Sequence, residues 1–173
     1  MKDFPEPRPT FSAGMVVAHA MEPLSEVLEM ARRAERLAKS VSDKRAIAVV
    51  AAPRSGANVE AAAHWEELIP PLAKVAGLYR AGQITRNFGH ELRKLLADRA
   101  LLGAEESLVP LARALARKKD APSELLEMLE TTKTRQDLER LMNILFLARP
   151  FAQGMMEAFG SDSDDTLGGQ DDA

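Results

Sequence analysis

The sequence of 173 residues contains no cysteine, one tryptophan and one tyrosine. Without cysteine the chain cannot form a disulfide, a zinc–thiolate site, an iron–sulfur cluster or a cysteine nucleophile. Aromatic residues make up only 5% of the chain, so few side chains could stack on nucleic-acid bases. No apolar run approaches the roughly 18 residues of a membrane-spanning helix, and no signal-peptide core is recognisable. We therefore expect a cytoplasmic protein without a transmembrane segment.

Hydrophobic residues make up 46% of the chain and charged residues 28%, which is typical of a globular domain. The net charge of −3 is unevenly distributed. Residues 160–173 carry five aspartates and no basic residue, and residues 1–14 carry three prolines with balanced charges. We predict a disordered lead-in at 1–14, a single helical domain at 15–159 and a disordered acidic tail at 160–173.

Apolar residues recur at steps of three and four along most of the chain, which is the spacing of helices. Residues 23–39 show it best, with acidic residues early and basic residues late, as the helix dipole favours. A further helix is expected from Asn58, with a kink or a break near Ile69 to Pro71. Others are expected from Thr85, Ser107, Ser123 and Thr134. The last should have a capping box with Asp137 and a bend at Pro150. The prediction is an all-α, compact bundle of about six or seven helices.

The apolar run at residues 47–52 leaves an alternative open, because its length suits either a short buried helix or a buried strand. As a strand it would pair with residues 16–17 and form one small βαβ unit near residues 15–52. The loop at 53–58, with Ser55 and Gly56, precedes an expected helix start, as many phosphate sites do. A small enzyme or nucleotide binder using this loop is therefore one alternative function, although the glycines and lysine of a P-loop are missing.

Histidines and carboxylates show no pattern that would build a catalytic or metal site. His90 lacks the second histidine four residues on that a zinc-protease helix needs. Glu60 lies four residues before His64, a spacing that we interpret as an ordinary surface pair, and His19 is isolated. The acidic pairs consist of adjacent residues, which point about 100° apart on a helix and do not converge. We therefore expect no enzyme activity, no metal and no cofactor.

The segment from Arg80 to Lys119 is basic, with nine basic and four acidic residues. Such a patch can contact phosphates, so association with nucleic acid is a second alternative function. Positive charge near the end of a helix also has a purely structural role, because it complements the helix dipole. The candidate phosphate-contacting residues are Arg113, Arg117, Lys118 and Lys119.

The expected helix at 134–159 is apolar on more than one face, so it is either central to a core or covered by a partner. Methionine adapts its shape to varied apolar surfaces and is common where helices dock. The candidate partner-binding residues are Met142, Phe146, Phe151, Met155, Met156 and Phe159. We favour a non-enzymatic protein–protein interaction protein, an adaptor, chaperone or assembly subunit that acts through apolar helix faces on a protein partner or by self-association.

Overall fold

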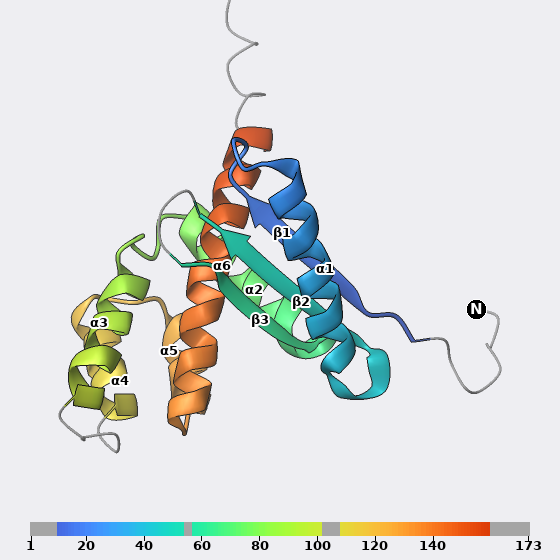
Figure 1. The fold of residues 1–173 in the computed structure, drawn as a ribbon. Coiled ribbons are helices and arrows are strands. Elements are labelled where there is room, and N and C mark those ends of the chain that lie inside the picture. The colour runs from blue at the N-terminus through green and yellow to red at the C-terminus, as the bar shows by residue number, and fades with distance from the viewer. Residues whose placement is uncertain (1–9, 54–56, 102–107, 160–173) are drawn as a thin grey trace, which may run out of the picture.

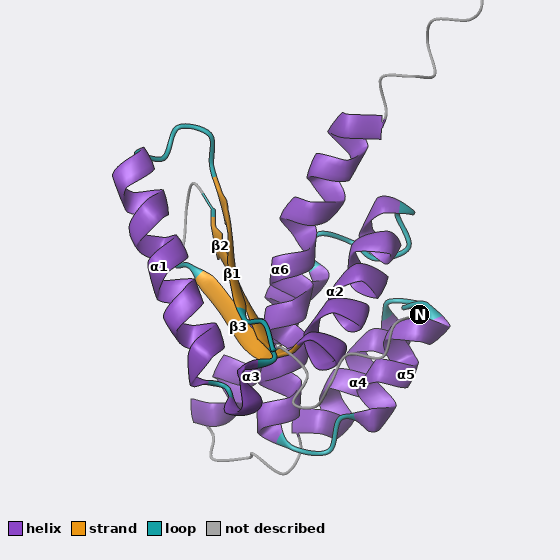
Figure 2. Ribbon diagram, turned by 90° about the vertical axis from the view of Figure 1, so that its right-hand side faces the viewer, coloured by secondary structure: helices purple, strands orange, loops and turns teal. Residues whose placement is uncertain are grey.

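The computed structural model describes residues 10–53, 57–101 and 108–159 and has an α/β fold (Figure 1). A three-stranded sheet lies between helix α1 on one face and a layer that contains helices α2 and α6 on the other (Figure 2). The all-α prediction is therefore wrong. The expected lead-in and acidic tail fall mainly at residues 1–9 and 160–173, which lie outside the described residues.

The sheet consists of β1 (Ala13–Ala18), β2 (Ala46–Ala52) and β3 (Val59–His64), in that order. Strand β1 runs parallel to β2, and β3 runs antiparallel to it. Helix α1 (Leu24–Ser40) makes the crossover from β1 to β2, so the βαβ unit that the sequence left as an alternative is present. All seven residues of β2 are buried, because this central strand is covered on both faces, which explains its unbroken apolar run.

Strand β3 occupies residues where the sequence predicts the start of a helix capped by Asn58. The Asn58 side chain instead lies near the sulfur of Met30, with Nδ2 and Sδ 3.5 Å apart. Three alanines give β3 a helical propensity, but the small side chains of Ala61 and Ala63 also let α6 approach the strand closely, while Ala62 faces α1. Asn143 on α6 donates from its amide to the Glu60 carbonyl at 3.3 Å. Tertiary packing therefore overrides the local preference for helix.

A short 3-10 turn, η1 (Ser42–Lys44), precedes β2, and the described part of the chain has five helices after the sheet. Helix α2 continues through both Pro70 and Pro71, so a break at that point is ruled out. Helix α6 likewise continues past Pro150. The predicted helices near residues 23–39, 85–102, 107–118, 123–129 and 134–159 are confirmed to within a few residues. The bounds are α2 (Trp65–Arg80), α3 (Phe88–Leu101), α4 (Leu108–Lys118), α5 (Ser123–Thr131) and α6 (Arg135–Phe159).

Helix α6 is apolar on several sides because it is central to the larger hydrophobic core. It packs on α2 and on the sheet, and it also contacts α3 and α4 (Figure 1). Its N-terminus has the predicted capping box: Thr134 Oγ1 accepts from the Asp137 amide at 3.1 Å, and Asp137 Oδ2 accepts from the Thr134 amide at 2.9 Å. The side chains of α6 that are buried are Leu138, Leu141, Ile144, Leu145, Phe146, Leu147, Ala148 and Ala152.

A second, smaller core lies between α1 and the other face of the sheet. Ala34 and Ala38 of α1 meet Ala48 and Val50 of β2 there. The helix comes so close to β1 that a Cβ placed on Gly14 would lie 2.4 Å from the Glu35 nitrogen. Glycine at this position is therefore a requirement of helix–strand packing rather than of a turn.

Candidate functional site

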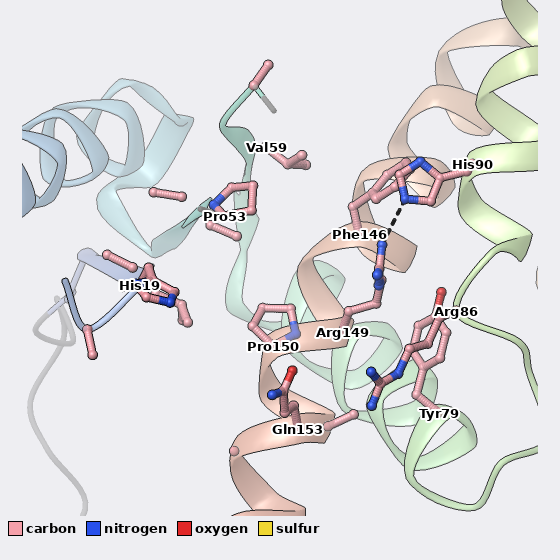
Figure 3. Close-up of a pocket in the computed structure, with 18 of the residues that line it drawn as sticks. His19, Pro53, Val59, Tyr79, Arg86, His90, Phe146, Arg149, Pro150 and Gln153 are labelled. Carbon is pink, nitrogen blue, oxygen red and sulfur yellow. Dashed lines mark hydrogen bonds between the residues drawn. The ribbon is translucent and has the colours of Figure 1, made fainter. Parts of the chain in front are cut away.

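A cleft of about 660 Å³ opens at the end of the sheet where the parallel strands β1 and β2 terminate (Figure 3). Ala18 and Ala52 are paired at that end, and the antiparallel β3 begins beside them at Val59. The opposite wall comes from α6, from the end of α2 and from the start of α3. Ligands of α/β proteins bind preferentially outside the carboxyl ends of parallel strands, so the cleft has the expected position for a binding site.

Basic and aromatic side chains dominate the polar part of this cleft. None of the described residues that line it is acidic. Figure 3 shows Arg86, Arg149 and Tyr79 on the helical side and His19 and Pro53 at the strand ends. The polar and aromatic lining residues are His19, Tyr79, Arg86, His90, Arg93, Phe146, Arg149 and Gln153.

Phe146 of α6 organises the basic side chains from α3. The Arg93 guanidinium lies over its ring, 3.9 Å from the ring centroid, in cation–π geometry. The His90 ring meets the same phenyl ring edge-on, with the centroids 5.0 Å apart. A Cβ on Gly89 would lie 3.4 Å from the Phe146 ring, so α3 approaches α6 closely at this point. The cleft residues are thus held by packing between two helices.

Arg149 and His90 are joined by a hydrogen bond across the wall of the cleft. Arg149 Nη1 donates to His90 Nε2 at 3.0 Å (Figure 3). A guanidinium has no acceptor, so this bond requires Nε2 to accept and places the ring proton on Nδ1. The arginine is therefore oriented by a neutral partner and keeps its full positive charge.

Tyr79 contributes a buried hydroxyl beside these arginines. Its oxygen has no hydrogen-bond partner among the residues that the structure describes. Burial raises the pKa of Tyr79 to about 12, and the nearby positive charge of Arg149 opposes part of that rise. The phenol therefore stays protonated at neutral pH.

Two of the four predicted phosphate-contacting residues have partners within the protein. Arg113 is bonded to three carbonyl groups at the end of α5, with the Nε–Leu129 O distance 3.0 Å. Lys119 forms an ion pair with Glu91 at 2.9 Å, and Arg117 and Lys118 are exposed. The basic residues that the structure brings to the cleft include Arg86 and Arg93 from the same segment. Sequence reasoning counted those two but did not single them out, and it missed Arg149.

The predicted partner-binding residues of α6 lie mostly against the core. Phe146 is 8% exposed, and Met142 and Phe151 are partly buried against the larger cluster. The side chains of Met155, Met156 and Phe159 lie outside the described residues, as do Ser55 and Gly56 of the predicted phosphate loop. Much of the apolar surface of α6 that we expected to bind a partner therefore packs in the core of the protein itself.

Exposed apolar side chains gather instead near β1 and the start of α1. Leu24 and Leu28 belong to the apolar stripe of residues 23–39, which also includes Val27 and Ala34. In the structure Ala34 is buried and Val27 is half-buried, but both leucines are exposed. The apolar stripe is therefore wider than one packing face, and this width was the sequence signal for exposed apolar surface. The large exposed hydrophobic residues are Phe11 (68%), Met15 (40%), Met21 (83%), Leu24 (71%) and Leu28 (48%).

In the described parts of the chain, no group of three or more histidine, aspartate or glutamate side chains could hold a metal ion. His64 lies apart from the other histidines, and its ring contacts the Ser42 carbonyl at 3.1 Å. No described helix is long and apolar enough to span a membrane.

Comparison with curated proteins and with solved structures finds no match to this chain. One family model matches, over residues 1–48, which is less than half of the chain. That stretch includes β1, α1 and the beginning of β2, so it concerns the sheet and stops before helices α2 to α6. The first 48 residues are similar to the second palm domain of Cas10/Cmr2.

Proposed function

We propose that this protein is a non-enzymatic assembly subunit that docks along the outer edge of β1, where a β-strand of a partner protein extends the sheet. The observation that carries the proposal is the open edge itself. Strand β1 has β2 on one side and no strand on the other within the described residues. Unpaired edges are sites of strand addition unless they are short, charged or covered. The strand of six residues here, Ala-Gly-Met-Val-Val-Ala, carries no charge.

Helix α1 has apolar side chains on the side that lies near this edge. Arg33 is paired with Glu60 of β3 at 2.9 Å, so that side of α1 faces β3. Leu24 and Leu28 lie one turn apart on the opposite side of the helix, which is the β1 side. The contact of Gly14 with the backbone of Glu35 supports this orientation, because Glu35 lies on the same side as the two leucines.

The other face of the open edge is apolar as well. Side chains alternate along a strand, and Gly14 faces α1, so Met15 faces the α6 layer. Met15 is 40% exposed because the α6 layer does not fully cover β1. A strand added beside β1 would therefore bury apolar side chains on both of its faces, Leu24 and Leu28 on one and Met15 on the other.

The small size of the sheet also supports an added strand. The matched residues 1–48 contain β1, α1 and the beginning of β2, and they resemble a palm domain. Three strands make a small sheet for a domain, and within the described residues β1 and β3 are both unpaired on their outer sides. We therefore place the partner strand beside β1, as an element that enlarges this palm-like unit. The similarity concerns only this part of the chain. In the proposal, helices α2 to α6 support the sheet.

The test compares two double variants that add the same charge. Leu24→Lys with Leu28→Lys changes the proposed surface, and Ala73→Lys with Ala114→Lys changes exposed positions on α2 and α4, away from it. Tagged full-length chains are isolated from cells of the native host, and the partner is identified by mass spectrometry. We expect the wild type and the Ala73/Ala114 control to retain the partner and the Leu24/Leu28 variant to lose it. Amide hydrogen exchange in β1 slows when the partner is bound.

Sedimentation equilibrium distinguishes a second copy of the chain from a different partner. A dimer that the Leu24/Leu28 variant abolishes would identify the added strand as β1 of another copy. Equal retention of the partner by both variants, or β1 amides that exchange equally fast in the free and bound protein, would contradict docking at this edge.

A further inference from the structure

The cleft at the carboxyl ends of β1 and β2 is a second surface, separate from the β1 edge. We propose that it binds a phosphate-bearing small molecule, held by Arg86, Arg93 and Arg149. The first argument is its charge. Three arginines line one cleft, and no described lining residue is acidic. Arginine forks bind phosphate oxygens in pairs, so several arginines in one cleft favour a multiply charged anion over a single carboxylate.

The second argument is that these charges have no acidic partner in the part of the chain that the structure describes. Several other basic side chains do pair with acids, as Arg33 does with Glu60 and Arg45 with Glu66. In the described part of the chain no carboxylate pairs with any of the three cleft arginines. Positive charges gathered without a counter-ion repel one another, and a bound anion removes that repulsion.

The third argument is that neutral contacts orient two of these arginines. The Arg149 guanidinium is held by the acceptor nitrogen of His90 at 3.0 Å, and the Arg93 guanidinium lies 3.9 Å from the centroid of Phe146. Both partners position a cation without neutralising it. A site whose donors are fixed before the ligand arrives loses less conformational entropy on binding.

The fourth argument is size. A cleft of about 660 Å³ lies within the range of roughly 300–1,000 Å³ that small-molecule pockets occupy. The strand ends and Pro150 of α6 supply an apolar floor beside the charged wall (Figure 3). Such a mixed lining suits a phosphate ester with an apolar or ring-shaped remainder. A nucleic-acid strand would instead need a groove that continues beyond the cleft.

The experiment is isothermal titration calorimetry of the full-length protein with pyrophosphate, adenosine monophosphate and adenosine. We expect saturable binding of the two phosphate compounds and none of adenosine. Tight binding of pyrophosphate alone identifies an inorganic phosphate as the ligand class, and tighter binding of the monophosphate identifies a phosphate ester. Absence of saturable binding by both phosphate compounds would overturn the proposal.

Two double variants locate the binding. Arg86→Gln with Arg149→Gln removes two cleft charges, and Arg117→Gln with Lys118→Gln removes two exposed charges outside the cleft. We expect the cleft variant to weaken binding by roughly tenfold or more, since each lost charged hydrogen bond is costly, and the control to change it by less than about twofold. Equal weakening by both pairs would mean diffuse attraction to a basic surface, which contradicts a cleft site.

Arg149 is partly buried, so its replacement could disturb folding. Arg86→Gln alone avoids this difficulty, because Arg86 is exposed and lies in the turn before α3. With an unchanged circular dichroism spectrum, this single variant should still weaken pyrophosphate binding several-fold. The last ligand is a 12-nucleotide RNA. If it binds more tightly than pyrophosphate, and if Arg86→Gln leaves its affinity unchanged, the cleft is not the anion site.

Discussion

Arg113 of α4 donates from Nε to the carbonyl oxygen of Leu129 in the last turn of α5, with the two atoms 3.0 Å apart. Its Nη2 also donates to the carbonyls of Glu130 and Thr132, at 3.0 and 2.9 Å. The last carbonyls of a helix lack intrahelical donors, so one guanidinium satisfies three acceptors at once. Arg113, a candidate phosphate contact from the sequence, therefore connects α4 to the end of α5 in the structure.

Replacing Arg113 should therefore lower stability and leave anion binding unchanged. Arg113→Met keeps the aliphatic stem and removes the donors, and we expect a loss of about 2 kcal/mol in the free energy of unfolding. Urea denaturation measures it. Arg117→Met, on the same helix but exposed, is the control and should change stability by less than about 0.5 kcal/mol. Equal losses in the two variants would show that the carbonyl contacts contribute little.

Two glycines give a second test with opposite signs. Gly14→Ala places a Cβ against the backbone of α1, 2.4 Å from the Glu35 nitrogen and 2.7 Å from the Ala34 carbonyl carbon. We expect it to cost about 1–3 kcal/mol, because backbone atoms must move. Gly77→Ala, within α2, meets no atom within 4 Å and should add about 0.5–1 kcal/mol, since alanine favours helix. Thermal and urea denaturation would contradict the packing at Gly14 if both variants gained stability.

The capping box of α6 predicts a pH dependence. Hydrogen bonds from the backbone amides of Thr134 and Lys133 hold the pKa of Asp137 below its ordinary value of 3.8. A carboxyl whose pKa is lower in the folded state stabilises the fold fully above the unfolded pKa. That contribution is lost as the pH falls through the folded pKa. Asp137→Asn should thus be less stable than the wild type at pH 7, and the difference should shrink below about pH 4.

Urea midpoints measured between pH 7 and pH 2.5 follow this difference. Asp98→Asn, which changes an exposed carboxylate on α3, is the matched control. A gap between Asp137→Asn and the wild type that stays constant down to pH 2.5 would show that the ionised carboxylate has no role in the cap.

Tyr79 can be observed alone, because it is the only tyrosine in the chain. Its ultraviolet absorbance should titrate near pH 12, well above an ordinary tyrosine, as long as the fold persists. Tyr79→Phe should keep or slightly raise stability, by up to about 1 kcal/mol, because the buried hydroxyl has no described partner to lose. Titration near pH 10 or a clear loss of stability in the phenylalanine variant would refute this description of the hydroxyl.

Local signals in the sequence were sufficient for the helices but not for the sheet. The capping box at Thr134 and Asp137 and the apolar spacing of residues 23–39 are local, and both are present as expected. The strands are rich in alanine, and an alanine-rich strand is decided by the elements around it. Residues 59–64 become β3 because α6, far along the chain, packs on them.

The candidate site was accessible from the sequence only in part. Val16, Val17 and the run at 47–52 pointed to parallel strand ends, which is where the cleft lies. Arg149 gave no signal, because an isolated basic residue in an apolar helix has no pattern around it. Its significance comes from the approach of α3 to α6, which brings His90 within hydrogen-bond distance.

The contact between Asn143 and the Glu60 carbonyl spans 83 residues and has a consequence for synthesis. A ribosome adding about 5–20 residues per second takes several seconds to pass from β3 to the middle of α6. Through that interval one face of β2 and β3 has no cover from α6. The nascent chain is therefore most prone to aggregate before α6 emerges from the ribosome. A chaperone would protect it most during that interval.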